Sequence, residues 1–190
     1  LSESLQELEA RLDVQSGTSL TSGDAWLTDD KAVAALVFRN TGTIRLTEFD
    51  RWDLMVDYYD GQETPALHTA WLPYTSGVPL NGEWTVEGLY LDAAAGQPEA
   101  FEPGILNPGE ELLITVRLSP EIGLGQTLQA SLTTETGIAA AILYARNYPP
   151  ELTANAGLNI PSGSAVVLTP TLLDVTDADQ PPAELIYTIT

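Results

Sequence analysis

Short apolar runs separated by turn residues fill most of the chain. This regular spacing of turns constrains the fold more than any other feature of the sequence. Residues 32–38 form a continuous apolar run that leads into the turn sequence Asn40-Thr41-Gly42-Thr43, after which residues 44–46 resume an extended pattern. Turn chemistry recurs at residues 60–61, 81–82, 107–109 and 123–125. Further strands are expected at residues 52–59, 83–91, 111–118, 126–133 and 139–145.

This pattern predicts a mainly β protein. About seven or eight short strands between residues 18 and 146, with no helix signal among them, favour an immunoglobulin-like antiparallel β-sandwich. The expected organisation is a short N-terminal helix at residues 1–15, a β-sandwich domain at residues 18–146 and a partial C-terminal β-module at residues 147–190.

A leucine seam marks the N-terminal helix. Leu1, Leu5, Leu8 and Leu12 follow one another at spacings of 4, 3 and 4, which places them on one side of an amphipathic helix that ends before Ser16. A helix of about three turns is too short to be stable alone in water. Two interpretations stay open: the helix docks on the domain that follows, or it packs against copies of itself, as the end of a longer helix in that case.

Three segments of the expected sandwich resemble the β-domain of archaellin-like and type IV pilin-like surface proteins. They are residues 37–43, which read V-F-R-N-T-G-T, and residues 54–61 and 106–112, the last of which opens a strand after an N-P-G-E turn. The resemblance covers residues 1–145 and implies an extracellular filament whose core is built from N-terminal helices. The residues given lack the long apolar half of that helix and its processing site.

Residues 147–190 resemble the opening of the cadherin-like, chondroitin-sulfate-proteoglycan-type repeat of bacterial surface proteins. The match starts at Asn147-Tyr148-Pro149-Pro150 and includes the run from Leu172 to Thr190. The family's repeat continues beyond this stretch, so the resemblance implies a partial module that stops in mid-strand. Two or three strands cannot bury both faces of a sandwich, so we expect completion by another chain or by a longer polypeptide.

Three acidic residues in the last module form the best candidate metal site. Asp174, Asp177 and Asp179 lie within six positions of an expected loop, and Asn147 or Glu151 could add an oxygen from the linker. Calcium takes hard oxygen ligands of this kind, and cadherin-like modules bind it at module junctions. The alternative is a solvated acidic turn closed by Asx hydrogen bonds. Calcium is the only cofactor that the sequence indicates.

The charge of the chain excludes several partners. With 27 acidic residues against 7 basic ones, the formal net charge is −20, which opposes binding to nucleic acid or to an anionic membrane surface. Like subunits repel one another unless cations offset the charge. The absence of cysteine excludes disulfides and thiolate metal sites. No apolar run is long enough to insert into a membrane.

Catalytic constellations are weak in this sequence. His68 is the only histidine of the chain. A cluster of carboxylates lies along one expected strand and the turn after it, and these acids are expected to form the solvent-facing side of that strand; they are Asp50, Asp53, Asp57 and Asp60. No enzyme activity is therefore predicted. The aromatic residues allow either a sugar-stacking platform or anchors of the core and of interfaces; they are Trp52, Trp71, Trp84, Tyr58, Tyr59, Tyr74 and Tyr90.

The functional prediction is a structural subunit of an extracellular filament or surface layer of a prokaryote, assembled head to tail by β-strand complementation. The alternative is a fragment of a large, multi-repeat, calcium-dependent surface adhesin. The sequence contains no Asn-X-Ser/Thr sequon, which excludes N-linked glycans and leaves O-linked ones open. The residues expected to make contacts between subunits are Leu1, Leu5, Leu8, Leu12, Val166, Leu168, Leu185, Tyr187 and Ile189.

Overall fold

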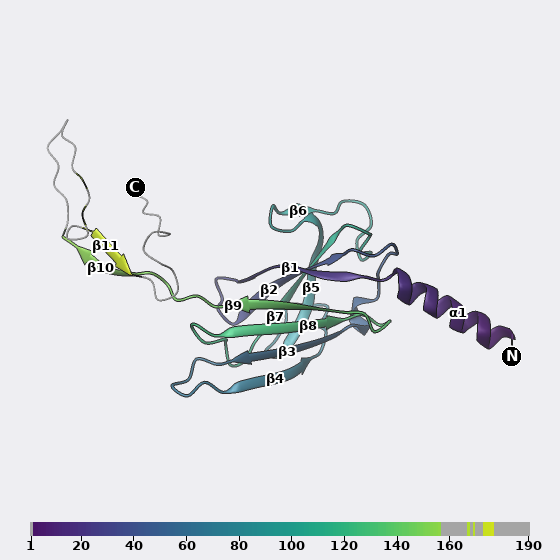
Figure 1. Ribbon diagram of the computed structural model, residues 1–190, viewed down its shortest axis with the longest axis horizontal. Coiled ribbons are helices and arrows are strands. Elements are labelled where there is room, and N and C mark those ends of the chain that lie inside the picture. Colours follow the sequence, from purple (N-terminus) through teal and green to yellow (C-terminus); the bar gives the residue numbers. More distant parts are fainter. Residues whose placement is uncertain (1, 157–166, 168, 170–172, 177–190) are drawn as a thin grey trace. The chain divides into compact units, whose positions relative to one another are not determined.

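The computed structural model describes residues 2–156, 167, 169 and 173–176 (Figure 1). The chain divides into two units, Leu1–Arg146 and Asn147–Thr190. The elements of the first unit are α1 (Ser2–Gly17), β1 (Leu20–Leu27), β2 (Val33–Asn40), the 3-10 helix η1 (Phe49–Arg51), β3 (Asp53–Tyr59), β4 (Leu67–Leu72), β5 (Glu83–Asp92), β6 (Gln97–Pro98), β7 (Glu111–Arg117), β8 (Thr127–Thr133) and β9 (Ala139–Ala145). The second unit contains β10 (Glu151–Asn155) and β11 (Leu173–Thr176).

The first unit is a sandwich of two antiparallel sheets. One sheet has the order β1-β2-β7-β5-β6 and the other the order β4-β3-β8-β9 (Figure 1). The strands can be given the letters used for immunoglobulin domains. A to D then correspond to β1, β2, β3 and β5, with β4 as C′, and E to G correspond to β7, β8 and β9. In these letters the two sheet orders are A-B-E-D and C′-C-F-G. This is the arrangement of immunoglobulin-like sandwiches. The predicted fold class is therefore confirmed.

The core lies between the two sheets. In β3 the inward residues Leu54 and Val56 are fully buried and alternate with exposed or half-buried outward residues, as expected for a strand with one face in solvent. The run of buried residues in β2 has a different cause. Its outer face is also covered, because Ala35 and Val37 pack with Leu113 in a second, smaller cluster against which Trp26 and Tyr90 lie. A continuous apolar run thus corresponds to a strand buried on both faces.

The strands of the first unit differ from the prediction at four places. Residues 44–46 form no strand, and only Leu46 among them makes an isolated bridge, to Leu106. The strands β1 and β4 and the two-residue strand β6 lie in segments where no individual strand was predicted. β1 contains Gly23 and Asp24 in a bulge that breaks its register between Ser22 and Ala25, which hides the period-two pattern of an edge strand.

None of the helices in the described residues is both long and apolar enough to cross a membrane.

Candidate assembly surfaces

The junction between α1 and the sandwich is built around Asn40. This residue is fully buried, and its Nδ2 donates to the carbonyl oxygens of Ile44 (2.9 Å) and Leu106 (3.0 Å), while its Oδ1 accepts from the Gly42 amide (3.0 Å). Asparagine supplies both donors and an acceptor from one short side chain, so a single buried residue satisfies three backbone groups. The N-T-G turn is thereby fixed in one conformation.

The N-P-G-E turn lies directly beside the N-T-G turn. The Gly109 amide donates to the Asn40 carbonyl (2.7 Å), and the Asn40 amide donates to the Glu110 carbonyl (2.9 Å). Glu110 is buried, and its carboxylate accepts from the Asn107 amide (2.7 Å). Gly109 has a φ of 90°, in the left-handed region that favours glycine. Two of the three segments that carry the first resemblance therefore meet at one end of the sandwich.

The helix α1 is attached at this same end. Its last residue, Gly17, accepts a hydrogen bond from the Thr43 amide (2.8 Å), and the Ser19 carbonyl accepts from the Thr41 amide (2.9 Å). A Cβ on Gly42 would overlap the Gly17 carbonyl oxygen and lie 2.7 Å from the Ser19 nitrogen, so only glycine fits there. The N-T-G turn thus fixes the point at which α1 leaves the sandwich.

The helix itself exposes its side chains. Every residue from Ala10 to Ser16 is exposed, and the seam residue Leu12 and its neighbour Val14 keep 55% and 43% of their surface accessible. Leu5 and Leu8 lie in α1 but their side chains are outside the described part, as is Leu1. The sandwich therefore does not bury the described part of α1. The interpretation in which the helix docks on its own domain is wrong for these residues.

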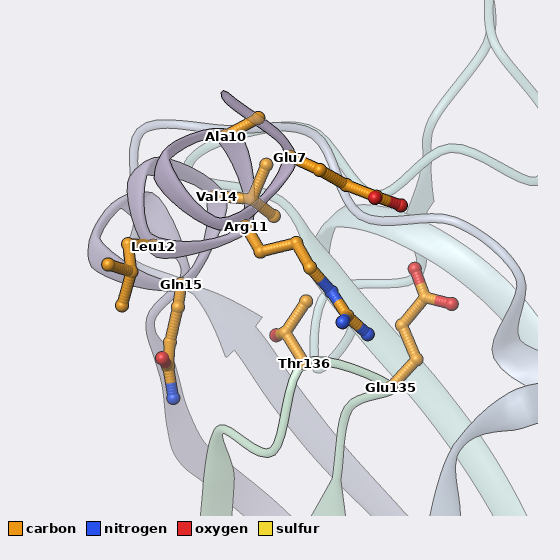
Figure 2. Close-up of a pocket in the computed structure, with 8 residues that line it drawn as sticks. All are labelled: Glu7, Ala10, Arg11, Leu12, Val14, Gln15, Glu135 and Thr136. Carbon is orange, nitrogen blue, oxygen red and sulfur yellow. The ribbon is translucent and has the colours of Figure 1, made fainter. Parts of the chain in front are cut away.

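A groove of 620 Å³ separates α1 from the turn between β8 and β9 (Figure 2). Figure 2 shows the Arg11 side chain extending toward Glu135 and Thr136 of that turn, while Leu12 points away from it. Leu12, the one seam residue whose side chain the structure describes, nevertheless contributes to the lining of the groove. The residues that line the groove are Glu7, Ala10, Arg11, Leu12, Val14, Gln15, Glu135 and Thr136.

In the second unit, β10 and β11 form an antiparallel two-stranded sheet. Leu152 pairs with Val175, and the register shifts between Leu152 and Ala154. Leu152 keeps 53% of its surface exposed. The residues of this unit that were predicted to make contacts between subunits lie outside the described residues; they are Val166, Leu168, Leu185, Tyr187 and Ile189.

The candidate calcium ligands are only partly described. Asp174 lies within strand β11 and not in the loop that the sequence predicted, and its Oδ2 accepts a hydrogen bond from Thr153 Oγ1 (3.1 Å). Asp177 and Asp179 are outside the described residues. Across the described part of the chain, no three His, Cys, Asp or Glu side chains converge on one point.

The carboxylates of β3 have separate structural roles. Asp53 accepts a hydrogen bond from the Trp71 indole (2.8 Å), and Asp57 accepts one from Thr69 Oγ1 (2.5 Å), both on the outer face of the sheet. Asp60 is buried at the end of β3, where it accepts from His68 Nε2 (2.9 Å). The His68 ring also stacks on Tyr58, with centroids 5.2 Å apart. These carboxylates fix β4 and its turn against β3.

The turn that joins β3 to β4 depends on ionised Asp60. Hydrogen bonds from His68, then from the Ala66 and Gln62 amides, hold the pKa of Asp60 below its ordinary value of 3.8. Because the folded-state pKa lies below the unfolded one, this stabilisation is present above about pH 4 and is lost as pH falls through the lowered pKa. Asp60→Asn is expected to lower stability at neutral pH and to flatten the loss of stability on acidification, measured by urea unfolding between about pH 6 and 2.

Asp24→Asn, which removes an exposed carboxylate, serves as the control and should keep the full acid dependence of the unmodified chain. Equal acid dependence in Asp60→Asn and Asp24→Asn would show that Asp60 does not hold the turn through its charge.

The aromatic residues divide between core and surface. Trp52, Trp84 and Tyr58 are buried between the sheets, as expected for core anchors. Trp71 and Tyr59 instead expose 56% and 40% of their surface on the outer face of the β4-β3-β8-β9 sheet. Sequence reasoning missed the role of Trp71 because residues 67–72 are apolar on both faces and show no clean alternation. Pro65 and Pro73, which bound this run, were the available signal.

Comparison with known proteins gives two kinds of match. A family model described as cadherin-like matches residues 150–190. No curated protein matches the sequence. Among solved structures, the archaellum periplasmic stator protein FlaG from Sulfolobus acidocaldarius is similar at 18% identity and a TM-score of 0.44, over 67% of this chain and 99% of that one.

Two archaeal flagellum structures are also similar to this chain. The flagellin FlaB1 from Methanocaldococcus jannaschii has 13% identity and a TM-score of 0.48, over 67% of this chain and 89% of that one. The flagellum of Methanospirillum hungatei strain JF1 has 12% identity and a TM-score of 0.45, over 76% of this chain and 74% of that one. The family-model match at residues 150–190 falls on the segment whose cadherin-like resemblance was noted in the sequence.

Proposed function

We propose that the chain is a structural, non-catalytic subunit of an extracellular filament or surface layer of a prokaryote. The observation that carries this proposal is the exposure of α1. A helix of 16 residues is marginal alone in water, and the sandwich leaves its side chains from Ala10 to Ser16 exposed. The helix then gains its stability from a surface outside its own sandwich. Packing against helices of neighbouring subunits supplies such a surface, with the seam residue Leu12 in the contact.

The second unit is proposed to connect successive subunits by strand addition. Its described strands, β10 and β11, form a two-stranded sheet, and an isolated pair of strands is marginally stable at best. A strand from a neighbouring chain that pairs with this sheet would extend it and cover Leu152. Because donor and acceptor are different surfaces, the contact is head to tail and propagates. The assembly residues predicted in 166–189 are proposed as the side chains that enter the partner.

Truncation after Arg146 tests the connector. The core residues within the described part of the chain lie in the first unit, between Leu20 and Ile142, so the truncated chain is expected to fold. Sedimentation velocity should show large, polydisperse assemblies for the full chain and a single small species for the truncated one. Far-ultraviolet circular dichroism provides the control that the sandwich is retained. Assemblies of equal size in both chains would contradict the role of the second unit.

The alternative function, a module of a calcium-dependent adhesin, is tested in the same experiment. Asp174, Asp177 and Asp179 are proposed as its calcium ligands, with Asn147 or Glu151 as a further oxygen donor. Under this alternative the full chain stays a single molecule and its second unit melts at a higher temperature in calcium than in chelator. Under the filament proposal the full chain assembles. If the assemblies then dissociate when a chelator is added, calcium is bound at the junction between subunits.

A further inference from the structure

The four strands at the sheet edges of the first unit are not equivalent. β1 and β9 are the edges of opposite sheets and contact each other, so that side of the sandwich is closed. β6 consists of two residues, one of which is Pro98. β4 is different: it is six residues long and pairs with β3 in an unbroken register from Leu54↔Leu72 to Tyr59↔Leu67. It therefore presents the long, regular open edge of this unit.

The β4 edge lacks the usual protection against pairing with another chain. Natural edge strands carry charged residues, especially lysine, or proline or a bulge. Residues 67–72 read L-H-T-A-W-L and contain none of the 27 acidic and 7 basic residues of the chain. Pro65 and Pro73 stand just outside the strand and limit the length of pairing to it. In a chain with a net charge of −20, two copies of this strand can pair without an acidic residue on either of the paired strands.

The side chains around the edge are apolar and exposed. Leu67 and Trp71 each expose 56% of their surface, and they stand opposite Tyr59 and Met55 of β3, which expose 40% and 48%. On this outer face, the carboxylates of Asp53 and Asp57 accept hydrogen bonds from the Trp71 indole and the Thr69 hydroxyl, while Asp60 is buried against His68. The bonds on the outer face hold Trp71 and Thr69 in place beside the edge.

We propose that β4 pairs antiparallel with β4 of a second copy of this chain. A two-fold axis through Thr69 places each Thr69 opposite the other and each Leu67 opposite Trp71 of the second copy. This register keeps outward side chains on the same face, whereas a shift of one residue would place outward side chains opposite inward ones. Two four-stranded sheets then become one continuous sheet. The contact goes beyond the proposed function, because it is isologous and uses neither α1 nor the second unit.

Cysteine cross-linking tests this register, because the chain contains no cysteine of its own. Thr69→Cys in the full chain is expected to form a disulfide dimer at least about tenfold faster than Thr127→Cys, since the geometry of antiparallel pairing brings the two Cβ atoms at position 69 close. Thr127 is a matched control: it is exposed on the same face but belongs to the interior strand β8. Equal, slow rates for both variants would overturn the proposal.

A charge placed on the edge provides the second test. Thr69→Lys should abolish the pairing, because two lysines would face each other across the axis, whereas Thr127→Lys should leave it intact. Both variants are compared by sedimentation velocity in the chain truncated after Arg146. The unmodified truncated chain and its Thr127→Lys variant are expected to form dimers, and the Thr69→Lys variant is expected to stay a monomer. If the Thr69→Cys variant cross-links only after residues 147–190 are removed, the edge is occupied by a second unit in the full chain and self-pairing there is wrong. A negative result for β4 pairing does not change the outcome expected when the chain is truncated after Arg146. A negative result in that truncation experiment likewise leaves the β4 pairing test valid.

Discussion

Asn40→Leu is expected to lower the free energy of unfolding by about 3 kcal/mol. Leucine is close to asparagine in size but leaves the Ile44 carbonyl without its bond from Asn40. It also removes one of the two bonds made by the Gly42 amide, which still donates to the Ser19 carbonyl, and one of the two bonds accepted by the Leu106 carbonyl. Each buried backbone group that loses its hydrogen bond costs about 1–3 kcal/mol. The upper part of that range applies here because Asn40 is fully buried.

The measurement for Asn40→Leu is urea unfolding of the full chain followed by tryptophan fluorescence, which reports the buried Trp52 and Trp84. Asn147→Leu is the matched control, since Asn147 is exposed, and it should change stability by less than about 0.5 kcal/mol. A loss of stability in Asn40→Leu no larger than in this control would show that the hydrogen bonds of Asn40 do not hold the two turns together.

Gly42→Ala is expected to cost about 2–3 kcal/mol through overpacking. The added methyl group would overlap the Gly17 carbonyl oxygen, which is backbone and cannot rotate away. The turn at residues 40–43 and the end of α1 must then separate, which breaks the bonds from Thr43 to Gly17 and from Thr41 to Ser19. The helical circular dichroism signal at 222 nm should fall together with the stability, because α1 loses its anchor.

Gly77→Ala controls for the general effect of replacing glycine. Nothing lies within 4 Å of the position of its Cβ, and its φ is not in the left-handed region, so this substitution should be neutral or slightly stabilising. Because Asn40 and Gly42 share a hydrogen bond, the double variant should lose less stability than the sum of the two single variants. Full additivity would mean that the two residues act independently and that the turn is not one unit.

The motifs that resembled a known family have a physical basis in this fold. N-T-G and N-P-G-E are both good turn sequences, and either alone would indicate only a turn. In the structure they share hydrogen bonds through Asn40, Gly109 and Glu110, and they stand beside the end of α1. Their joint presence in the sequence therefore carried information about a contact between distant segments.

The sequence predicted the strands that follow a clear rule. β3 and β8 alternate between inward and outward residues, and β2 and β7 are continuous apolar runs, so both kinds were expected with boundaries within two residues. β4 was not predicted, because its outward side chains Leu67 and Trp71 are as apolar as its inward Leu72. An exposed apolar face removes the contrast on which period-two patterns depend.

The candidate sites were harder to predict than the fold. The spacing of Leu1, Leu5, Leu8 and Leu12 predicts a helix, but it cannot tell whether the seam faces its own domain or another chain. The structure adds the exposure of Leu12 and Val14, which depends on where the N-T-G turn directs the helix. The acidic spacing of Asp174 likewise indicated a loop, whereas pairing with β10 places Asp174 in a strand.

Electron microscopy of the purified full chain tests the central claim most directly. At protein concentrations well above those of the sedimentation experiment, with and without calcium, the account predicts filaments or layers with a regular subunit repeat. Truncation after Arg146 should leave individual sandwich domains or their pairs on the same grids. Single, unassociated particles of the full chain under every condition would contradict the account.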